Sequence, residues 1–253
     1  MTAVEIFIIA AGAVVAGFVQ GLSGFGFGLV ALSIWIWFLP PPLAAALSVF
    51  GSLTGQIVAA ITVKRTVPWA VVAPFLAGGV LGVPLGLTLL PHLDVTIFKA
   101  ALGTVLLVVC PLLLTSGRLP AITFGGRSSD AIAGAVGGAM SALGGLSGVV
   151  PSLWSTLRGF DKVTQRHVIQ TFNLSILAFT FIAYLATGHI TIGMVPQLAV
   201  VAIAVLVPVL IGARVYAGIS DQQFKRIVLG LLTASGLVML LSTAPSLWTR
   251  LQG

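Results

Sequence analysis

Charged side chains are scarce in this sequence. Asp, Glu, Lys and Arg make up 7% of its 253 residues, only five residues are acidic, and 58% of the chain is hydrophobic. The mean hydropathy of +1.17 lies far outside the range of soluble domains. This composition excludes a soluble enzyme or a soluble binding module, because too few polar side chains are available to face water. The sequence therefore predicts an all-α integral membrane protein.

Residues for disulfide, metal and cofactor chemistry are also few. Cys110 is the single cysteine, so no internal disulfide can form, and no cluster of Cys, His and acidic residues has metal-ligand spacing. No G-x-x-x-x-G-K-[ST] motif is present, and GFGLVA at 26–31 lacks the strand–helix context of a dinucleotide site. We therefore expect no cofactor and no bound metal. The net charge of +7 is interpreted as cytoplasmic loop charge, so nucleic acid is not an expected partner.

Apolar segments of membrane-spanning length recur along the chain. The opening segment, residues 4–39, is unusual because 36 residues would form a helix of about 54 Å, too long for a hydrocarbon core of about 30 Å. We expect this segment to break at its glycine cluster, residues 21–28. The six remaining segments are each near the 20 residues that one crossing needs, and they are 43–63, 68–91, 97–116, 168–187, 193–214 and 224–244.

The tetrapeptide GLSG occurs twice, at 21–24 and at 145–148. AGAVVAGFVQ precedes the first copy and AGAVGGAMSALG precedes the second, so the two regions align with a gap of two residues. Matches in the same order through both halves indicate a duplication, which is typical of transporters. We therefore divide one membrane domain into a first repeat, residues 1–117, a cytoplasmic linker, residues 118–130, and a second repeat, residues 131–253.

Two topologies fit these segments. If each half opens with one long broken span, the protein has eight transmembrane helices, and the 12 Lys and Arg residues divide seven to five between the two sides. If each half opens with a re-entrant helical hairpin followed by three transmembrane helices, the repeats are inverted and ten of the 12 share one side. The positive-inside rule favours the second topology, with both termini outside. The ten residues are Lys64, Arg65, Arg118, Arg127, Arg158, Lys162, Arg166, Arg214, Lys225 and Arg226.

A helix broken deep in the membrane leaves backbone N–H groups that lipid cannot satisfy. These groups, with the positive end of the following half-helix, form an anion site, to which Gly gives close access and Ser adds a hydroxyl. Two facing breaks would form one such site at the centre of the membrane. The substrate-binding residues predicted in the breaks are Ser23, Gly24, Gly26, Ser147 and Gly148.

Close helix packing alone is the alternative role for the glycines of the two breaks. We predict such a packing role for Gly78, Gly82 and Gly86, because they follow the small-xxx-small pattern.

Large polar side chains inside the predicted spans extend the site. Gln20 lies beside the first break, Gln56 lies in the next span, and Gln170 and Asn173 share a helix face in the second half. Buried amides are costly unless paired, so these four are candidate binding residues, with hydrogen bonding between helices as the alternative. Three further residues fall at the predicted cytoplasmic mouth and either attract an anion or anchor the topology: Arg158, Arg166 and His167.

These motifs resemble the sulfite exporter TauE/SafE family of membrane permeases. The resemblance rests on GFVQGLSGFGFGLVALS, which begins at Gly17, and on GGAMSALGGLSGVVPSLW, which begins at Gly137, and it covers essentially the whole chain. It implies a secondary transporter that moves sulfite, an organosulfonate or a related small anion across the bacterial inner membrane by alternating access. Many members have denser glycine runs followed by proline, whereas Phe25 and Phe27 interleave the first motif here, which leaves the substrate open.

The expected partners are a small anionic substrate and the lipid bilayer, and self-association into a homo-oligomer is left open. A passive anion channel is the main alternative function. No acidic residue falls inside a span as a proton relay would, which argues against proton coupling through Asp or Glu but does not separate a uniporter from a channel. A rhomboid-type intramembrane serine protease would need a histidine beside one of the two serines. His92, His167 and His189 instead map to segment ends, so an enzyme is not expected.

Overall fold

The structure is a computed structural model that describes residues 1–62, 69–92, 94–115, 122, 125–215 and 221–252. These residues form helices and contain no β-strand, which confirms the predicted all-α class. The helices are α1 (Ala3–Ser23), α2 (Phe27–Trp35), α3 (Pro41–Thr62), α4 (Trp69–Leu89), η1 (Leu90–His92), α5 (Val95–Thr115), α6 (Gly126–Gly144), α7 (Val149–Leu157), α8 (Lys162–Ala186), η3 (Ile192–Met194), α9 (Val195–Val215) and α10 (Asp221–Gln252).

Both GLSG segments interrupt a helix, as expected. In the first, α1 ends at Ser23 and α2 begins at Phe27, and Gly24 and Gly26 between them have φ values of 76° and 102°. In the second, α6 ends before Gly145, which has a φ of 72°, and α7 begins at Val149. Positive φ is strained for residues with a Cβ, so glycine permits these turns. The prediction that residues 4–39 break within the glycine cluster is confirmed.

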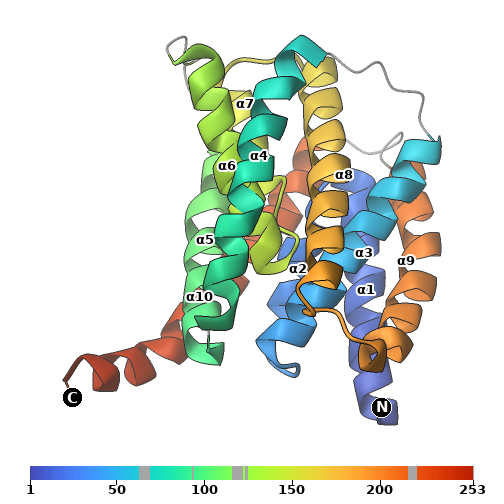
Figure 1. The fold of residues 1–253 in the computed structure, drawn as a ribbon, viewed down its shortest axis with the longest axis vertical. Helices are drawn as coiled ribbons and strands as arrows, with labels where there is room; N and C mark the ends of the chain where they lie inside the picture. Colours follow the sequence, from blue (N-terminus) through green and yellow to red (C-terminus); the bar gives the residue numbers. More distant parts are fainter. Residues whose placement is uncertain (63–68, 93, 116–121, 123–124, 216–220, 253) are drawn as a thin grey trace.

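Each interrupted helix folds back as a hairpin. Figure 1 shows α2 running beside α1 toward the end of the molecule where α1 begins, and α7 running beside α6 toward the opposite end. The arms are unequal, because α1 has 21 residues and α2 has nine, while α6 has 19 and α7 has nine. Each half therefore opens with a helical hairpin, and α1 is by itself long enough to cross a membrane.

Within the described part of the chain, six helices are long and apolar enough to cross a membrane, namely α1, α3, α4, α5, α8 and α9, and the last five have boundaries close to predicted segments. Residues 232–248 of α10 form a shorter apolar helix among the described residues. The predicted set of six differed in one member, because it contained the α10 segment and treated α1 only as part of a hairpin. The chain is a multi-pass membrane protein.

Glycines allow the closest helix contacts. A Cβ atom at Gly78, Gly82 or Gly86 of α4 would overlap the backbone carbonyl oxygens of Ala131, Ala135 and Ala139 on α6. The same kind of contact brings α1 against α9 and α5 against α10. Small residues at helix interfaces let two backbones approach, which is how helices associate where lipid removes the hydrophobic driving force. The packing role predicted for these three α4 glycines is confirmed.

The packing pairs follow a regular exchange between the two halves. α1 packs against α9 and α6 packs against α4, and likewise α3 packs against α9 and α8 packs against α4. Exchanging the first five α-helices for the last five, in order, converts each of these contacts into its partner. This pattern is expected of two structurally equivalent repeats, and both their inversion and their boundaries remain a prediction.

Part of the predicted linker is helical in the structure. α6 begins at Gly126, inside the predicted linker 118–130, because Gly125 and Gly126 provide the turn that starts the helix. The rest of that linker lies outside the described residues apart from Ile122, as do Lys64, Arg65 and Arg118.

Trp35 holds the first hairpin together. Its side chain is fully buried, its Nε1 donates to the carbonyl oxygen of Ile8 at 3.2 Å, and its ring meets that of Phe27 edge to face. The ring also covers Gly12 of α1, where a Cβ would overlap it. Trp35 is therefore a core residue that fixes α2 on α1 and so positions the first break.

Candidate binding site between the hairpin tips

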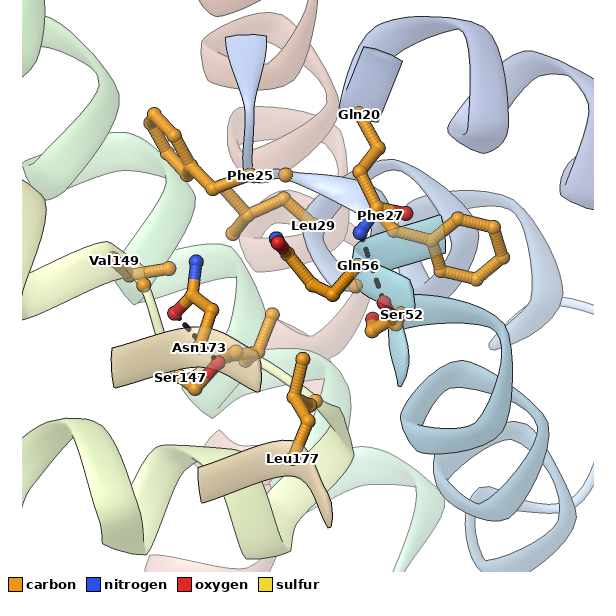
Figure 2. A pocket seen from close by; sticks show the side chains of 15 residues that line it. Gln20, Phe25, Phe27, Leu29, Ser52, Gln56, Ser147, Val149, Asn173 and Leu177 are labelled. Atoms are coloured by element: carbon orange, nitrogen blue, oxygen red, sulfur yellow. Dashed lines mark hydrogen bonds between the residues drawn. The ribbon is translucent and has the colours of Figure 1, made fainter. Parts of the chain in front are cut away.

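The two breaks meet in the interior of the molecule. A Cβ at Gly28, in the first turn of α2, would lie 2.8 Å from the carbonyl oxygen of Gly145, so the tips are in direct backbone contact. Beside this contact lies a cavity of ≈ 10 Å³, about the space of one water molecule. Figure 2 shows side chains from both halves around it. The lining residues are Gln20, Phe25, Gly26, Phe27, Gly28, Leu29, Ser52, Gln56, Gly145, Leu146, Ser147, Gly148, Val149, Asn173 and Leu177.

Both short helices begin at this cavity. The first turn-closing bond of α2 runs from Val30 N to Gly26 O at 3.1 Å, and that of α7 runs from Ser152 N to Gly148 O at 3.0 Å. The N–H groups that precede them have no acceptor within their own helix, as at any helix N-terminus. Their partial positive charge favours an anion near the first turn. The two breaks therefore direct two positive helix ends into one space.

Ser147 and Asn173 form the polar contact of the second tip. Ser147 is 1% exposed, and its hydroxyl donates to Asn173 Oδ1 at 2.9 Å. Because the Asn173 oxygen accepts this bond, its amide nitrogen points away from Ser147 toward the cavity, as Figure 2 shows. Gly148 is needed beside this amide, since a Cβ there would lie 2.7 Å from Asn173 Nδ2. The pair therefore presents an N–H donor to the cavity.

Ser23 has a different environment from Ser147. Its hydroxyl donates to the carbonyl oxygen of Val19 at 2.8 Å and also contacts the backbone of Phe25. It is half-buried, and it is absent from the cavity lining. In this structure Ser23 satisfies the backbone of the first break, whereas Ser147 lines the cavity.

Two buried glutamines connect the first tip to α3. Gln20 Nε2 donates to the carbonyl oxygen of Ser52 at 2.9 Å, and Gln56 Nε2 donates to that of Gly24 at 2.8 Å. Gln20 is 3% exposed and Gln56 is 1% exposed. Among the described residues, neither Gln20 Oε1 nor Gln56 Oε1 has a hydrogen-bond partner, and the Ser52 hydroxyl has none either. The residues that line the cavity thus include buried amide oxygens without a donor as well as N–H donors.

The structure places six of the nine predicted binding residues in the cavity lining. These are Gln20, Gly26, Gln56, Ser147, Gly148 and Asn173. Gly24 lies next to it, with its carbonyl bonded to Gln56, and Gln170 lies beside Gly24 with its amide nitrogen 3.5 Å from where a Cβ would stand. Among the nine predicted residues, Ser23 differs because its hydroxyl bonds to the backbone of its own segment.

The predicted mouth residues lie at the other end of the second hairpin. Arg158, which ends α7, forms an ion pair with Asp130 of α6, with 3.6 Å between Arg158 Nε and Asp130 Oδ1. Trp154 Nε1 donates to the same oxygen at 2.8 Å, and Asp130 is 3% exposed. These contacts join the two arms of the hairpin. The sequence placed Asp130 in the predicted linker. Its pairing with Arg158 arises because α7 folds back along α6.

Arg166 and His167 lie in the first turns of α8, where both are half-buried. The helix is capped by Asp161, whose Oδ1 accepts from the N–H groups of Val163 and Thr164 at 3.0 and 3.1 Å. Hydrogen bonds from Thr164, together with the Val163 N–H, lower the pKa of this carboxyl. The cap fixes the start of α8, which carries Gln170 and Asn173 two to three turns further on.

The fold and the site together define a class of protein, a multi-pass helical membrane protein with a polar site enclosed between two interrupted helices. The model of the family described as Sulfite exporter TauE/SafE matches residues 9–239, so the chain belongs to that family. It is accordingly a membrane transporter of the class that moves sulfite or related anions. Comparisons with curated proteins and with solved structures give no match.

Proposed function

We propose that this protein carries a small sulfur oxyanion, sulfite or an organosulfonate, across the bacterial inner membrane by alternating access. The observation that carries the proposal is the meeting of two helix N-termini at one small cavity with several polar lining residues. A helix N-terminus is equivalent to roughly half a positive charge, and its effect is stronger where water is excluded. The two termini and the Asn173 amide, which the Ser147 hydroxyl orients, supply the donors that an oxyanion needs.

The size of the cavity supports a mechanism in which the tips move. A space of ≈ 10 Å³ holds about one water molecule, and an oxyanion with three or four heavy atoms around sulfur is larger. The hairpins must therefore separate for binding. The two hairpins pack against different helices, because α1 contacts α9 whereas α6 contacts α4. Rocking of the α1–α9 pair against the α4–α6 pair would open the cavity to one side at a time, as in transporters built from inverted repeats.

The orientation follows from the charges. The start of α6, the end of α7, the start of α8 and the end of α9 lie at the end of the molecule opposite the N-terminus (Figure 1), and they carry Arg127, Arg158, Arg166 and Arg214. The positive-inside rule assigns this end to the cytoplasm and both termini to the outside. This orientation, like the two-repeat division at 1–117 and 131–253, is part of the proposal.

Transport by proteoliposomes tests the proposed function. Purified protein is reconstituted and loaded with sulfite, and we expect saturable sulfite flux that is accelerated by sulfite on the opposite side. Such counterflow separates a carrier from the alternative, a passive channel, whose flux does not saturate in this way and exceeds carrier rates in a conductance measurement. Empty liposomes are the control. No flux of sulfite or of any organosulfonate above that control would contradict the proposal.

The protease alternative has little support in the site. Ser147 bonds to Asn173, and Ser23 bonds to its own backbone. His189 instead bonds to Thr187 and stacks on Tyr184. Neither serine has a histidine partner among the described residues, so a general base for nucleophilic attack is missing from this part of the chain.

A further inference from the structure

The cavity contains hydrogen-bond acceptors that a simple oxyanion cannot satisfy. Gln20 and Gln56 line the cavity, and their Oε1 atoms are buried without a donor among the described residues. The orientation of both amides is fixed by their nitrogens, which donate to the carbonyl oxygens of Ser52 and Gly24. Turning either amide over would place two acceptor oxygens against each other. A fully deprotonated oxyanion offers acceptors alone, so it would leave these two oxygens unpaired and would be repelled by them.

The charge available at the cavity is also limited. Its described lining contains no Lys, Arg, His, Asp or Glu side chain. Positive potential therefore comes from the N-termini of α2 and α7, each equivalent to roughly half a charge, or about one charge together. One such charge balances a monoanion. A dianion would keep an uncompensated charge in a poorly hydrated space, which is strongly unfavourable.

We infer that the cavity selects a singly charged sulfur oxyanion that carries its own hydrogen-bond donor. Hydrogensulfite and sulfonates that bear a hydroxyl group belong to this class, whereas sulfate, fully deprotonated sulfite and sulfoacetate do not. The oxyanion group would face the N–H groups of the two tips and Asn173 Nδ2. The hydroxyl group would donate to Gln20 Oε1 or Gln56 Oε1. This inference rests on the proposed function, and it specifies the ionic form of the substrate.

The strength of the selection follows from burial. A site that contains a buried polar group discriminates strongly against a ligand that leaves this group unpaired, because its lost hydration is then not replaced. A hydrophobic site discriminates less between ligands that differ by one hydroxyl. Two sulfonates that differ in that group alone therefore give the sharpest comparison.

Binding of isethionate and ethanesulfonate to the full-length protein tests the inference. These monoanions differ by one hydroxyl, and we expect isethionate to bind at least about tenfold more tightly in calorimetry on protein in nanodiscs. Sulfate and sulfoacetate, as dianions, should not compete at the same concentrations. Sulfite should bind more tightly as the pH is lowered through its second ionisation, because the hydrogensulfite fraction rises.

Variants identify the acceptors. In Gln20→Met and Gln56→Met the amide oxygen is replaced in a side chain of similar length, and we expect the preference for isethionate over ethanesulfonate to shrink several-fold. A general loss of structure would weaken both ligands equally and leave their ratio unchanged, so the ratio separates the two effects. Ser33→Ala, on α2 but outside the cavity lining, is the matched control and should keep the wild-type ratio.

The results that overturn the inference differ from those that overturn the proposed function. Equal affinity for isethionate and ethanesulfonate, or sulfate binding as tight as isethionate binding, contradicts the inference and leaves anion transport standing. Binding of ethanesulfonate that reaches the isethionate affinity when sodium is added also contradicts it, since the amide oxygens would then hold a cation. If no sulfite or sulfonate binds at any pH, the proposed function fails.

Discussion

Ser23 and Ser147 occupy the same place in the repeated tetrapeptide, yet their hydroxyls have different partners. Ser23 bonds to the backbone of its own break, and Ser147 bonds to Asn173 across the cavity. The repeat predicted equivalent serines, because identical letters carry no information on which way a side chain turns. The neighbouring helix decides this, and α8 supplies an amide for Ser147.

A Ser147→Ala variant tests this difference at the level of one hydroxyl. We expect sulfite affinity to fall about tenfold, because the Asn173 amide loses the bond that orients it and one buried acceptor is left unpaired. The measurement is calorimetric binding of sulfite to the purified protein, with thermal unfolding to show that the fold is intact. Ser33→Ala, whose hydroxyl bonds to the carbonyl oxygen of Val30 within α2, is the control. Wild-type affinity in Ser147→Ala would remove Ser147 from the site.

The buried pairing of Asp130 could not be predicted from its position in the sequence. It is one of only five acids, and its position in the sequence placed it in a solvated linker. In the structure it is buried between Trp154 and Arg158, which lie on the other arm of the hairpin. Burial of a carboxylate requires paired hydrogen bonds and charges. Those partners are 24 and 28 residues away in the chain, so no local pattern reveals them.

Helix boundaries, in contrast, follow from local chemistry. The length of the opening apolar segment required a break, and the glycine cluster determined where it falls. The sequence also predicted a close helix contact, since Gly78, Gly82 and Gly86 recur every four residues on one face of α4. What the pattern did not reveal was the partner, because a small-residue face fits any helix that can approach it. The structure pairs this face with α6, the long arm of the second hairpin.

A Gly82→Val variant tests the α4–α6 contact. The added side chain would overlap the backbone of Ala135, so the helices must separate, and we expect a loss of about 1–3 kcal/mol of stability. Thermal unfolding of detergent-solubilised protein measures the loss as a lowered midpoint. Gly230→Val is the matched control, because Gly230 of α10 has no atom within 4 Å of its would-be Cβ. Equal midpoints for the two variants would show that α4 and α6 are not packed through Gly82.

The arrangement of the whole molecule depends on the two hairpins opening in opposite directions. With one hairpin at each end, both tips reach the interior, and both chain termini lie at the same end (Figure 1). Eight continuous crossings would have placed the breaks in two separate spans with no reason to meet. The charge distribution favoured the hairpins, because it was nearly even in one topology and ten to two in the other.

Cysteine labelling tests this topology in cells. Cys110 is fully buried, so a Cys110→Ala background removes the single native thiol. We expect Thr2→Cys, at the start of α1, to react with a membrane-impermeant maleimide from outside, and Ser128→Cys, at the start of α6, to react only after the cells are opened. Both positions are exposed, so access rather than burial determines labelling. Labelling of Ser128→Cys in intact cells would contradict the proposed orientation.

The sequence by itself determined the class of protein, the helical segments, the positions of both breaks and most of the polar residues around them. These features depend on composition, segment length and backbone conformation, which are local properties of the chain. The tertiary structure alone decided which groups meet: Gly28 against Gly145, Ser147 with Asn173, and Asp130 with Arg158. It also left Gln20 Oε1 and Gln56 Oε1 unpaired among the described residues, because their nitrogens are held by carbonyl groups on neighbouring helices. Hydrogen bonding is a pairwise property, so it becomes defined only when distant segments are brought together.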